Sequence, residues 1–268
     1  MDKLGIIAGS GELPLAAARA ARANGVKLLV AAAFDGETRE EIEKLADEAV
    51  WLKVGQLGKL IETFTTRGVR ECIMVGQIAP KNLFNLRPDL RAVKLLARLK
   101  EKNAESIFGA IAAELEKEGV HLIDAAPFLK ELMPGAGVLT KRQPSDEQRA
   151  DIEFGLKIAK GVSSFDIGQT VVVKNGVVLA VEAWEGTDEC IKRGGLLAGK
   201  DVGAVVVKVS KPNQDMRFDI PTIGPRTIET CREAKIAVLA IEANRTLLLE
   251  REKTIAAAAT AKIVITAF

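Results

Sequence analysis

The sequence contains no tyrosine and a single histidine, His121, among its 268 residues. Because this histidine lies in an apolar run, we expect it to be structural, so neither a histidine-based triad nor a histidine metal site is available. Cysteine is scarce too, since Cys72, Cys190 and Cys231 are far apart and form no Cys-x-x-Cys pair. This usage predicts a reducing compartment and argues against a thiol nucleophile. General base and metal-ligand roles are left to carboxylates.

Long apolar runs are also lacking, and none approaches the roughly 18 residues that a membrane-spanning helix needs. The apolar start at Leu4 meets glycine by Gly9, which is too short for a signal peptide. We therefore expect a cytoplasmic protein. The formal net charge of +2 gives no reason to expect whole-protein attraction to nucleic acid. Apolar residues make up 48% of the chain, which is typical of a globular protein with a substantial core.

The first half of the chain alternates short apolar runs with helical patterns, as βαβ units do. We expect strands at residues 4–8, 26–33, 50–54, 72–75 and 120–123. Helices are expected between them, including one of mixed charge over residues 38–48. The order predicts an α/β fold with an open, mostly parallel, Rossmann-like sheet. Residues 133–144 are rich in proline and glycine and form the predicted linker between domains 1–133 and 134–268.

The second half has a different pattern, which predicts a mixed α+β domain. Ser145 and Gln148 fit a capping box that opens a helix. Asn175-Gly176 lies between two apolar runs and is a strong signal for a β-hairpin. Thr187 suits the N-cap of a further helix.

Two loops in the first half are candidates for ligand binding. Gly9-Ser10-Gly11-Glu12-Leu13-Pro14 follows a strand and opens a helix, where backbone N–H groups and the helix dipole favour phosphate. The third glycine of a dinucleotide fingerprint and the Gly-Lys-Ser/Thr of a P-loop are both missing. A tight turn without a ligand is the alternative. Gln77 follows the fourth strand and is either a base- or sugar-binding amide or an ordinary loop residue.

Residues 81–102 carry seven basic side chains against Asp89 and Glu101. Arg91, Lys94 and Arg98 fall at helical spacing. An amphipathic basic helix of this kind is compatible with a membrane surface or a phosphorylated lipid. The alternative is that the basic side of the helix is simply exposed to solvent while its apolar side packs in the core.

Carboxylates gather in two places in the second half. Glu182, Glu185 and Asp188 span a strand end and a helix start. Asp215 and Asp219 lie in a polar, proline-punctuated stretch and, on an extended chain, would be about 13 Å apart at ~3.3 Å per residue. Two such side chains cannot ligate one Mg²⁺ unless the backbone bends. Either the segment bends, or the two aspartates have separate roles.

Taken together, these motifs resemble the LpxI-type pyrophosphatase family. The resemblance covers nearly the whole chain, and its most specific motif is Gln214-Asp215-Met216-Arg217-Phe218-Asp219-Ile220-Pro221. The other matching segments are residues 4–14, 54–58, 86–91, 166–169, 180–188 and 223–227. Ser10 stands where the family usually has glycine, and Asn213 and Asn244 are similar departures at turn positions.

The resemblance implies hydrolysis of the pyrophosphate of UDP-2,3-diacylglucosamine to 2,3-diacylglucosamine 1-phosphate (lipid X) and UMP, a step of lipid A biosynthesis. It implies dependence on Mg²⁺ or Mn²⁺. It also implies an essential aspartate, which corresponds to either Asp215 or Asp219 in this sequence. It places the nucleotide on the N-terminal domain and the acylated sugar phosphate on the C-terminal domain. A weak peripheral contact with the inner membrane is expected, and a homodimer is left open.

Pyrophosphate hydrolysis needs charge neutralisation and a positioned water rather than a covalent nucleophile. The candidate catalytic residues are Asp215, Asp219, Arg217, Lys208 and Lys211. The candidate substrate-binding residues are Gly9, Ser10, Gly11, Gln77, Gln169, Gln214 and Thr187. The candidate metal ligands are Asp215, Asp219, Glu182, Glu185 and Asp188.

Two other classes of function remain as alternatives. The first strand, loop and helix also fit an oxidoreductase that binds NAD(P) or a nucleotide sugar, although tyrosine is absent and no histidine is available for proton transfer. The basic helix also fits a non-catalytic protein that binds anionic lipid, which leaves the carboxylates of the second half unexplained. Cofactor release on denaturation would identify the first class, and lipid binding without turnover the second.

Overall fold

The structure is a computed structural model that describes residues 1–77, 88–100, 104–201, 203–212 and 214–268. The chain divides into two compact units. Unit 1 comprises Met1–Leu129 together with Asp215–Asp219, and unit 2 comprises Lys130–Gln214 together with Ile220–Phe268. A short segment from the second half of the sequence therefore packs with the first half.

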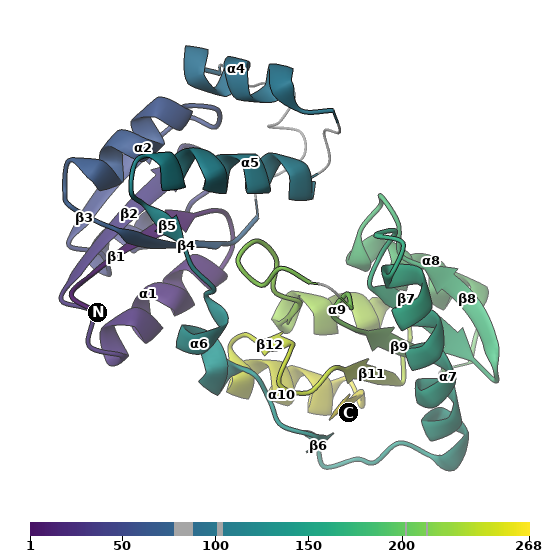
Figure 1. The fold of residues 1–268 in the computed structure, drawn as a ribbon. Coiled ribbons are helices and arrows are strands. Elements are labelled where there is room, and N and C mark those ends of the chain that lie inside the picture. Colours follow the sequence, from purple (N-terminus) through teal and green to yellow (C-terminus); the bar gives the residue numbers. More distant parts are fainter. Residues whose placement is uncertain (78–87, 101–103, 202, 213) are drawn as a thin grey trace. The chain divides into compact units, whose positions relative to one another are not determined.

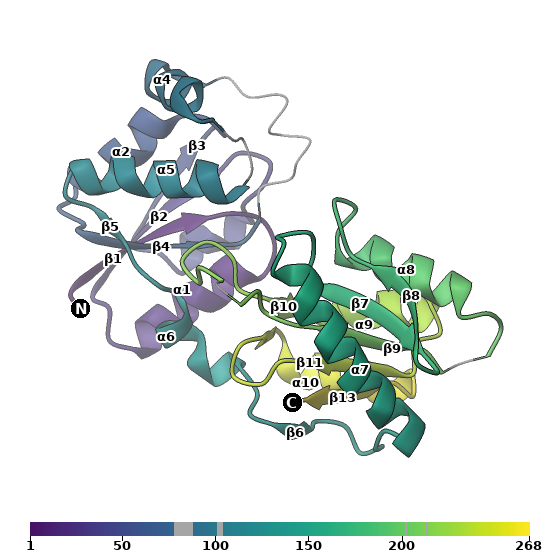
Figure 2. The same cartoon turned by 45° about the vertical axis from the view of Figure 1, so that its right-hand side comes forward.

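Unit 1 is built on five parallel strands in the order β3-β2-β1-β4-β5. The strands are β1 (Lys3–Ala8), β2 (Leu28–Phe34), β3 (Glu48–Leu52), β4 (Glu71–Val75) and β5 (His121–Leu122). The helices are α1 (Leu13–Ala23), α2 (Leu57–Thr65), α4 (Leu90–Arg98), α5 (Ala104–Lys117) and α6 (Ala126–Leu129). Helix α1 lies on one face of the sheet and α2 and α5 on the other, with α4 packed against both of them (Figures 1 and 2). The predicted Rossmann-like parallel sheet is confirmed.

Side chains of α2 show how this layer forms. Leu57, Leu60, Ile61 and Phe64 recur on one side of the helix and are buried in the core between helix and sheet. Asp89 ties α4 to the same helix, because its carboxylate accepts hydrogen bonds from Ala92 N at 2.8 Å and from Gly58 N at 2.6 Å. The first of these bonds caps α4.

The helix predicted over residues 38–48 is wrong. The segment forms only a short 3-10 helix, η1 (Glu40–Lys44), and β3 begins at Glu48. Ile42 is the one buried residue of η1, so the segment has no apolar stripe with which to hold a longer helix. Asp47 accepts a hydrogen bond from Leu29 N at 2.7 Å, which fixes the start of β3 beside β2.

Unit 2 contains a six-stranded sheet in the order β6-β13-β11-β9-β7-β8 and a two-stranded sheet, β10-β12. The strands are β6 (Gly137–Val138), β7 (Thr170–Lys174), β8 (Val177–Val181), β9 (Val205–Lys208), β10 (Thr222–Ile223), β11 (Val238–Ile241), β12 (Leu247–Leu248) and β13 (Val264–Ala267). Strands β9, β11 and β13 are parallel, and the outer strands β6, β7 and β8 are antiparallel to their neighbours. The predicted mixed domain is confirmed, and β6 comes from within the predicted linker.

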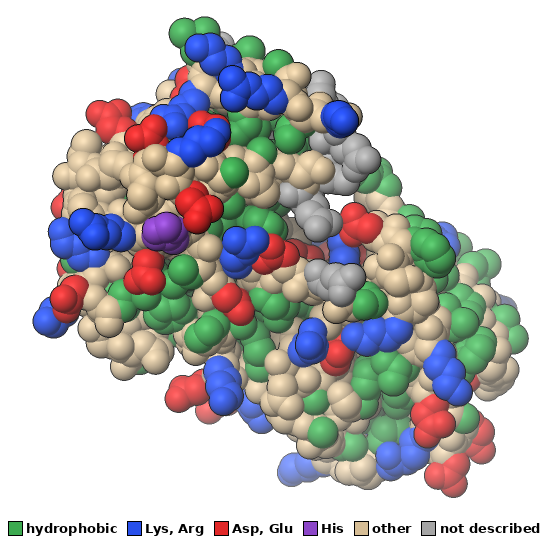
Figure 3. Space-filling view, in the orientation of Figure 1, with side chains coloured by type: hydrophobic (Ala, Val, Ile, Leu, Met, Phe, Trp, Pro, Cys, Tyr) green, Lys and Arg blue, Asp and Glu red, His purple; other side chains and the backbone are tan. Residues whose placement is uncertain are grey.

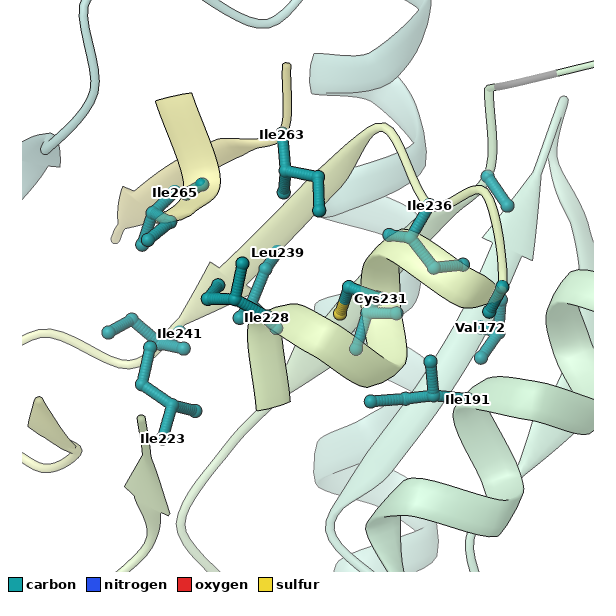
Figure 4. Close-up of a cluster of buried hydrophobic side chains, with 14 of the residues drawn as sticks. Val172, Ile191, Ile223, Ile228, Cys231, Ile236, Leu239, Ile241, Ile263 and Ile265 are labelled. Carbon is teal, nitrogen blue, oxygen red and sulfur yellow. The ribbon is translucent and has the colours of Figure 1, made fainter. Parts of the chain in front are cut away.

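Helices cover both faces of the six-stranded sheet. A 3-10 turn, η2 (Lys130–Leu132), leads into this unit, and its helices are α7 (Asp146–Ser163), α8 (Thr187–Leu197), α9 (Pro225–Glu233) and α10 (Arg251–Thr260). Residues alternate between the faces, so Val205 and Val207 pack with α7 whereas Val206 packs with the other three helices. Figure 4 shows this second core, where Ile228 and Cys231 of α9 meet strand residues.

Of the three local motifs predicted in unit 2, the structure confirms two and contradicts one. The capping box of Ser145 and Gln148 is confirmed. The β7-β8 hairpin is confirmed too, and Asp151 accepts hydrogen bonds from both turn residues at 2.8 and 2.7 Å. Thr187 as an N-cap is wrong, because Gly186 occupies that position with φ of 83°. The Thr187 hydroxyl has partners outside the helix. Within the described residues, no helix is long and apolar enough to cross a membrane.

Candidate active site

One edge of the unit 2 sheet collects the polar ends of four strands. Thr170 opens β7 opposite Lys208, the last residue of β9, and Lys208 is also opposite Ile241 of β11. Glu182 directly follows β8, and Glu242 directly follows β11. The register therefore brings side chains from distant parts of the sequence to the edge where parallel strands end, which is where α/β sheets bind ligands.

A buried cation lies at this edge. Lys208 is 5% exposed, and its ammonium donates a hydrogen bond to Thr187 Oγ1 at 2.9 Å. The Thr187 hydroxyl in turn donates to Glu182 Oε1 at 2.8 Å, and Glu182 is 7% exposed. An ammonium has three donors, and Thr187 is the single hydrogen-bond partner of Lys208 among the described residues. The remaining donors are available to an anion.

Two buried side-chain oxygens on the same sheet edge lack hydrogen-bond partners among the described residues. Gln169 N donates to Glu182 Oε2 at 3.3 Å, whereas Gln169 Oε1 and Thr170 Oγ1 are buried without a partner among the described residues. Buried polar atoms without partners are uncommon, and a bound ligand is one explanation. The structure thus gathers Gln169, Glu182, Thr187 and Lys208, which are four of the predicted site residues.

A second polar network on the same edge was not predicted. Glu242 Oε2 accepts from Lys160 Nζ at 2.7 Å and from both N and Oγ of Ser210 at 2.8 Å. Arg245 adds a weaker contact with Ser210 Oγ at 3.4 Å. Burial alone would raise the pKa of Glu242, but the hydrogen bonds from Lys160 and Ser210 outweigh it and hold that pKa below its usual range. The signal available in the sequence was the position of Glu242 directly after a buried strand.

The other predicted residues of unit 2 have separate partners. Glu185 pairs with Arg193 at 2.5 Å, and hydrogen bonds from Arg193 lower the pKa of Glu185. Asp188 pairs with Arg226 at 2.9 Å. The Lys211 ammonium pairs with Asp166, while Lys211 N donates to Gln214 Oε1 at 2.8 Å.

Asp215 and Asp219 stand at the two ends of one turn. Asp215 O accepts hydrogen bonds from Phe218 N at 3.0 Å and from Asp219 N at 3.3 Å. Of the two arrangements considered from the sequence, the segment therefore bends. The turn packs within unit 1, where Phe218 stacks on Phe108 of α5 with ring centroids 6.2 Å apart.

Arg217 clamps the first of these aspartates. Its guanidinium donates to Asp215 Oδ1 at 2.9 Å through Nε and to Oδ2 at 2.6 Å through Nη2. These bonds lower the pKa of Asp215 and raise that of Arg217. The guanidinium carbon also lies 5.1 Å from the centre of the Phe218 ring. Asp215 is therefore ionised at neutral pH and held in one orientation.

The glycine loop of unit 1 is closely packed against its neighbour. Ser10 donates to Gln77 O through both N and Oγ at 2.7 Å, and Gly9 N donates to Val75 O at 2.8 Å. A Cβ on Gly9 would lie 2.7 Å from Gln77 O, so only glycine allows this approach. These N–H groups are thus already engaged, and of the predicted loop donors Gly11 N remains.

The helix after the loop starts with an acid. Glu12 is the N-cap residue of α1, and its carboxylate pairs with Arg19 and Arg39 at 2.5 Å each. A carboxylate already at a helix N-terminus competes with a ligand anion for the same dipole. Glu12 and the bonded N–H groups of Gly9 and Ser10 therefore leave Gly11 N as the loop donor without a bond among the described residues.

A metal ion would need several oxygen donors in one place. Among the described residues, no group of three or more acidic, histidine or cysteine side chains is placed to hold a metal ion. Asp215 is clamped by Arg217 in unit 1, and Glu182, Glu185 and Asp188 are engaged within unit 2. The side chains that the structure describes therefore do not fit a preformed metal site.

The cysteines and the histidine contribute no nucleophile. All three cysteines are free and buried, and burial raises the pKa of Cys72 and Cys190 to about 12. His121 lies in strand β5, as expected, but its side chain is 56% exposed and lies 3.5 Å from Glu116. Strand alternation explains this, because Leu122 takes the inward position.

Comparison with known proteins gives a consistent match over nearly the whole chain. The model of the LpxI N-terminal domain matches residues 3–132, and that of the LpxI C-terminal domain matches residues 135–266. A curated relative, the UDP-2,3-diacylglucosamine pyrophosphatase LpxI of Caulobacter vibrioides, is 34% identical over 96% of this chain and 94% of its own length.

Solved structures are more distant. Phosphoribosylglycinamide synthetase from Anaerococcus prevotii is 12% identical, with a TM-score of 0.28 over 69% of this chain and 39% of that chain. N5-carboxyaminoimidazole ribonucleotide synthetase from Thermotoga maritima is 16% identical, with a TM-score of 0.25 over 76% and 45%. The chain spans less than half the length of either, and likenesses at this level carry no argument about fold or function.

Proposed function

We propose that this chain, which belongs to the LpxI family, hydrolyses the pyrophosphate of UDP-2,3-diacylglucosamine to 2,3-diacylglucosamine 1-phosphate and UMP. Water adds to one phosphorus and the bridging P–O bond breaks, so that the bridging oxygen leaves with the other phosphate. The two protons of the water pass to solvent or to the product phosphates. Family membership over nearly the whole chain supports the substrate. The observation in this structure that carries the chemistry is the buried ammonium of Lys208, which donates to Thr187 alone among the described residues. The same sheet edge also carries two buried oxygens without partners, Gln169 Oε1 and Thr170 Oγ1.

Lys208 is the residue proposed to stabilise the transition state. Negative charge grows on the phosphate oxygens as the bridging bond breaks, and a preorganised cation in a dry site stabilises that charge far more than one in water. Thr187 fixes the position of the ammonium, and Glu182 fixes the Thr187 hydroxyl. The negative charge of Glu182 also offsets part of the free-energy cost of burying the Lys208 ammonium. Gln169 Oε1 is proposed as an acceptor for a substrate hydroxyl.

The turn of Asp215 and Asp219 in unit 1 is proposed, by itself, as a further catalytic element. A carboxylate held ionised by Arg217 is suited to orient a water molecule through an accepted hydrogen bond. Arg217 is itself suited to contact a phosphate oxygen, because a guanidinium has five donors and Asp215 engages only part of them. Dependence on Mg²⁺ or Mn²⁺ is proposed from the family resemblance alone.

The test is direct. Purified protein is incubated with UDP-2,3-diacylglucosamine in detergent, with and without Mg²⁺, and UMP is measured over time. We expect UMP and the acylated sugar 1-phosphate in equal amounts. Release of neither product under any condition would refute the proposed function, and release of UDP instead of UMP would show that the sugar–phosphate bond is cleaved.

A further inference from the structure

The Asp215–Asp219 turn carries the proposed catalytic carboxylates, yet the chain on both sides of it belongs to the other unit. The residue before the turn and the residue after it are part of unit 2, whereas the five residues between them pack with unit 1. The described backbone hydrogen bonds of the turn are internal, since Phe218 N and Asp219 N both donate to Asp215 O. These bonds shape the turn, and side-chain contacts with unit 1 are needed to hold it in place.

Phe218 makes such a contact. Its side chain packs against the hydrophobic core of unit 1. Its ring stacks on Phe108 of α5, with centroids 6.2 Å apart and an interplanar angle of 26°. Aromatic pairs in this arrangement stabilise a structure beyond the apolar area that they bury. The ring of Phe218 therefore attaches the turn to helix α5.

The same ring holds a cation. The guanidinium carbon of Arg217 lies 5.1 Å from the centre of the Phe218 ring, which is within the range of a cation–π contact. In this arrangement the guanidinium donates to both carboxylate oxygens of Asp215, at 2.9 and 2.6 Å. A continuous chain of contacts thus runs from α5 through Phe218 and Arg217 to the carboxylate.

Arg217 has other carboxylates within reach of its charge. The hydrogen-bonded side chain of Asp215 raises the pKa of Arg217 most, and the charges of Glu116 and Asp124 add to that rise. The Arg217 side chain is 44% exposed. Without the ring, its guanidinium would be free to turn towards these acids, because a long side chain at the surface has many rotamers. The contact with Phe218 favours the orientation that clamps Asp215.

We infer that Phe218 is a positioning residue, which fixes Asp215 by holding Arg217 over its ring. The importance of this contact for the reaction rests on the proposed function, in which the Asp215 carboxylate orients a water molecule. Displacement of a catalytic group by about 1 Å can slow a reaction roughly 10²-fold. Loss of the ring should therefore lower kcat and leave KM little changed.

The first experiment measures whether Phe218 holds the turn, and it needs no substrate. Hydrogen–deuterium exchange is followed by mass spectrometry in the peptide that contains the amides of residues 218 and 219. Phe218→Leu keeps an apolar side chain but removes the ring. Phe154→Leu, at a half-buried phenylalanine packed against the core of unit 2, is the matched control.

We expect exchange in the turn to be roughly 5- to 30-fold faster in Phe218→Leu, because both aromatic contacts are lost. The control should stay within roughly twofold of wild type in this peptide. Equal exchange in Phe218→Leu and wild-type protein would overturn the inference.

Kinetics then test the link from Phe218 to Asp215. We expect Phe218→Leu to lower kcat for UMP release roughly 10- to 100-fold, with KM within roughly threefold of wild type. Trifluorophenylalanine in place of Phe218 keeps the shape of the ring but weakens its attraction for a cation, so kcat should fall roughly two- to fivefold. This variant also serves in both experiments if Phe218→Leu does not fold, as judged by circular dichroism.

A double-mutant cycle separates positioning from packing. With Arg217→Gln already present, Phe218→Leu should lower kcat by no more than roughly twofold, because the contact through which it acts is gone. An equal loss in both backgrounds, or a wild-type kcat in Phe218→Leu or with the fluorinated ring, would overturn the inference. Wild-type protein that releases no UMP would instead refute the proposed function, and the exchange experiment would then decide alone whether Phe218 holds the turn.

Discussion

Lys208 Nζ lies 2.9 Å from Thr187 Oγ1, although the two residues belong to different elements, the end of β9 and the start of α8. The Thr187 hydroxyl donates a hydrogen bond to Glu182, so the buried ammonium and the buried carboxylate are connected through one neutral group. Had the two charges met directly, the ammonium would have been neutralised by its own carboxylate. The intervening hydroxyl leaves the cation able to bind an anionic ligand.

Replacing this lysine should abolish most activity without unfolding the protein. Lys208→Met keeps the length and apolar stem of the side chain and removes the charge. We expect kcat to fall roughly 10²- to 10³-fold, as for other preorganised donors, with little change in circular dichroism. Lys192→Met, which removes an exposed ammonium on α8, is the control and should retain its rate. Equal rates for the two variants would remove Lys208 from the mechanism.

The two aspartates of the turn can be separated by kinetics. Asp215→Asn and Asp219→Asn each change one carboxylate to an amide of the same shape. We expect at least one of them to lower turnover by roughly 10² or more, with the fold intact. Glu153→Gln, on the exposed side of α7, controls for the loss of one negative charge. Near wild-type turnover by both aspartate variants would show that the assignment of the catalytic turn is wrong.

The sequence was sufficient for elements whose signals are local or strictly periodic. The alternation of apolar runs and helices predicted the parallel sheet of unit 1, and Asn175-Gly176 predicted the β7-β8 hairpin. Prediction failed where tertiary contacts override local preference. Thr187 is a good N-cap by propensity, yet its hydroxyl bonds to Lys208 and Glu182, and Gly186 takes the N-cap position instead.

In the candidate site, too, single residues could be predicted from the sequence, whereas their contacts depend on the tertiary structure. Gln169, Glu182, Thr187 and Lys208 could be chosen as polar residues near strand ends, but their meeting depends on the β7-β8-β9 register. Lys160 and Glu242 were missed because they are 82 residues apart and neither lies in a recognisable motif. The bend at Asp215–Asp219 was left open, since it depends on packing with residues of the first half such as Phe108.

Metal dependence is proposed because of the family resemblance, so we expect removal of divalent metal to stop the reaction. A pyrophosphate brings its own oxygen ligands, so Mg²⁺ can be held together with substrate although the described residues offer no group of three ligating side chains. Treatment with EDTA followed by dialysis should reduce UMP release to background, and added Mg²⁺ or Mn²⁺ should restore it. Full activity in EDTA would refute metal dependence, but it would not contradict the roles proposed for Lys208 and Asp215.

The Lys160–Glu242 pair should make stability depend on pH in the acid range. The pKa of Glu242 is lowered in the folded state, so its contribution is present at neutral pH and is lost as the pH falls through that lowered value. Glu242→Gln should therefore lower the free energy of unfolding by about 1–2 kcal/mol at pH 7. The difference from wild type should shrink as the pH falls below about 4.

Urea titration at several pH values measures this difference, with Glu153→Gln as the control for charge. A difference between Glu242→Gln and wild type that is unchanged from pH 7 into the acid range would show that ionisation of Glu242 contributes nothing to stability.

The outer surface of α4 is the remaining candidate for contact with a membrane. Figure 3 shows Lys and Arg side chains gathered over this helix. Arg91, one of three residues expected to form the basic face, instead pairs with Glu114 at 3.1 Å and Glu118 at 2.7 Å, so its charge is balanced. Lys94 and Arg98 remain at the surface, next to Leu90, which is 79% exposed, and Val93, which is 47% exposed. Of the other basic residues in the stretch, Lys81, Arg87 and Lys102 lie outside the described residues.

Exposed apolar side chains flanked by cations are typical of helices that lie in a membrane interface. We therefore predict weak binding to vesicles that contain phosphatidylglycerol. Each basic residue contributes about 1 kcal/mol at an anionic surface, so Lys94→Gln/Arg98→Gln should weaken binding by roughly 10- to 30-fold. Lys44→Gln/Arg70→Gln removes the same charge elsewhere on unit 1 and should have little effect. Raising the salt concentration should weaken wild-type binding, because it shortens the Debye length. Sedimentation with vesicles at low and high salt measures all of these, and equal binding by the two double variants would leave α4 without a membrane role.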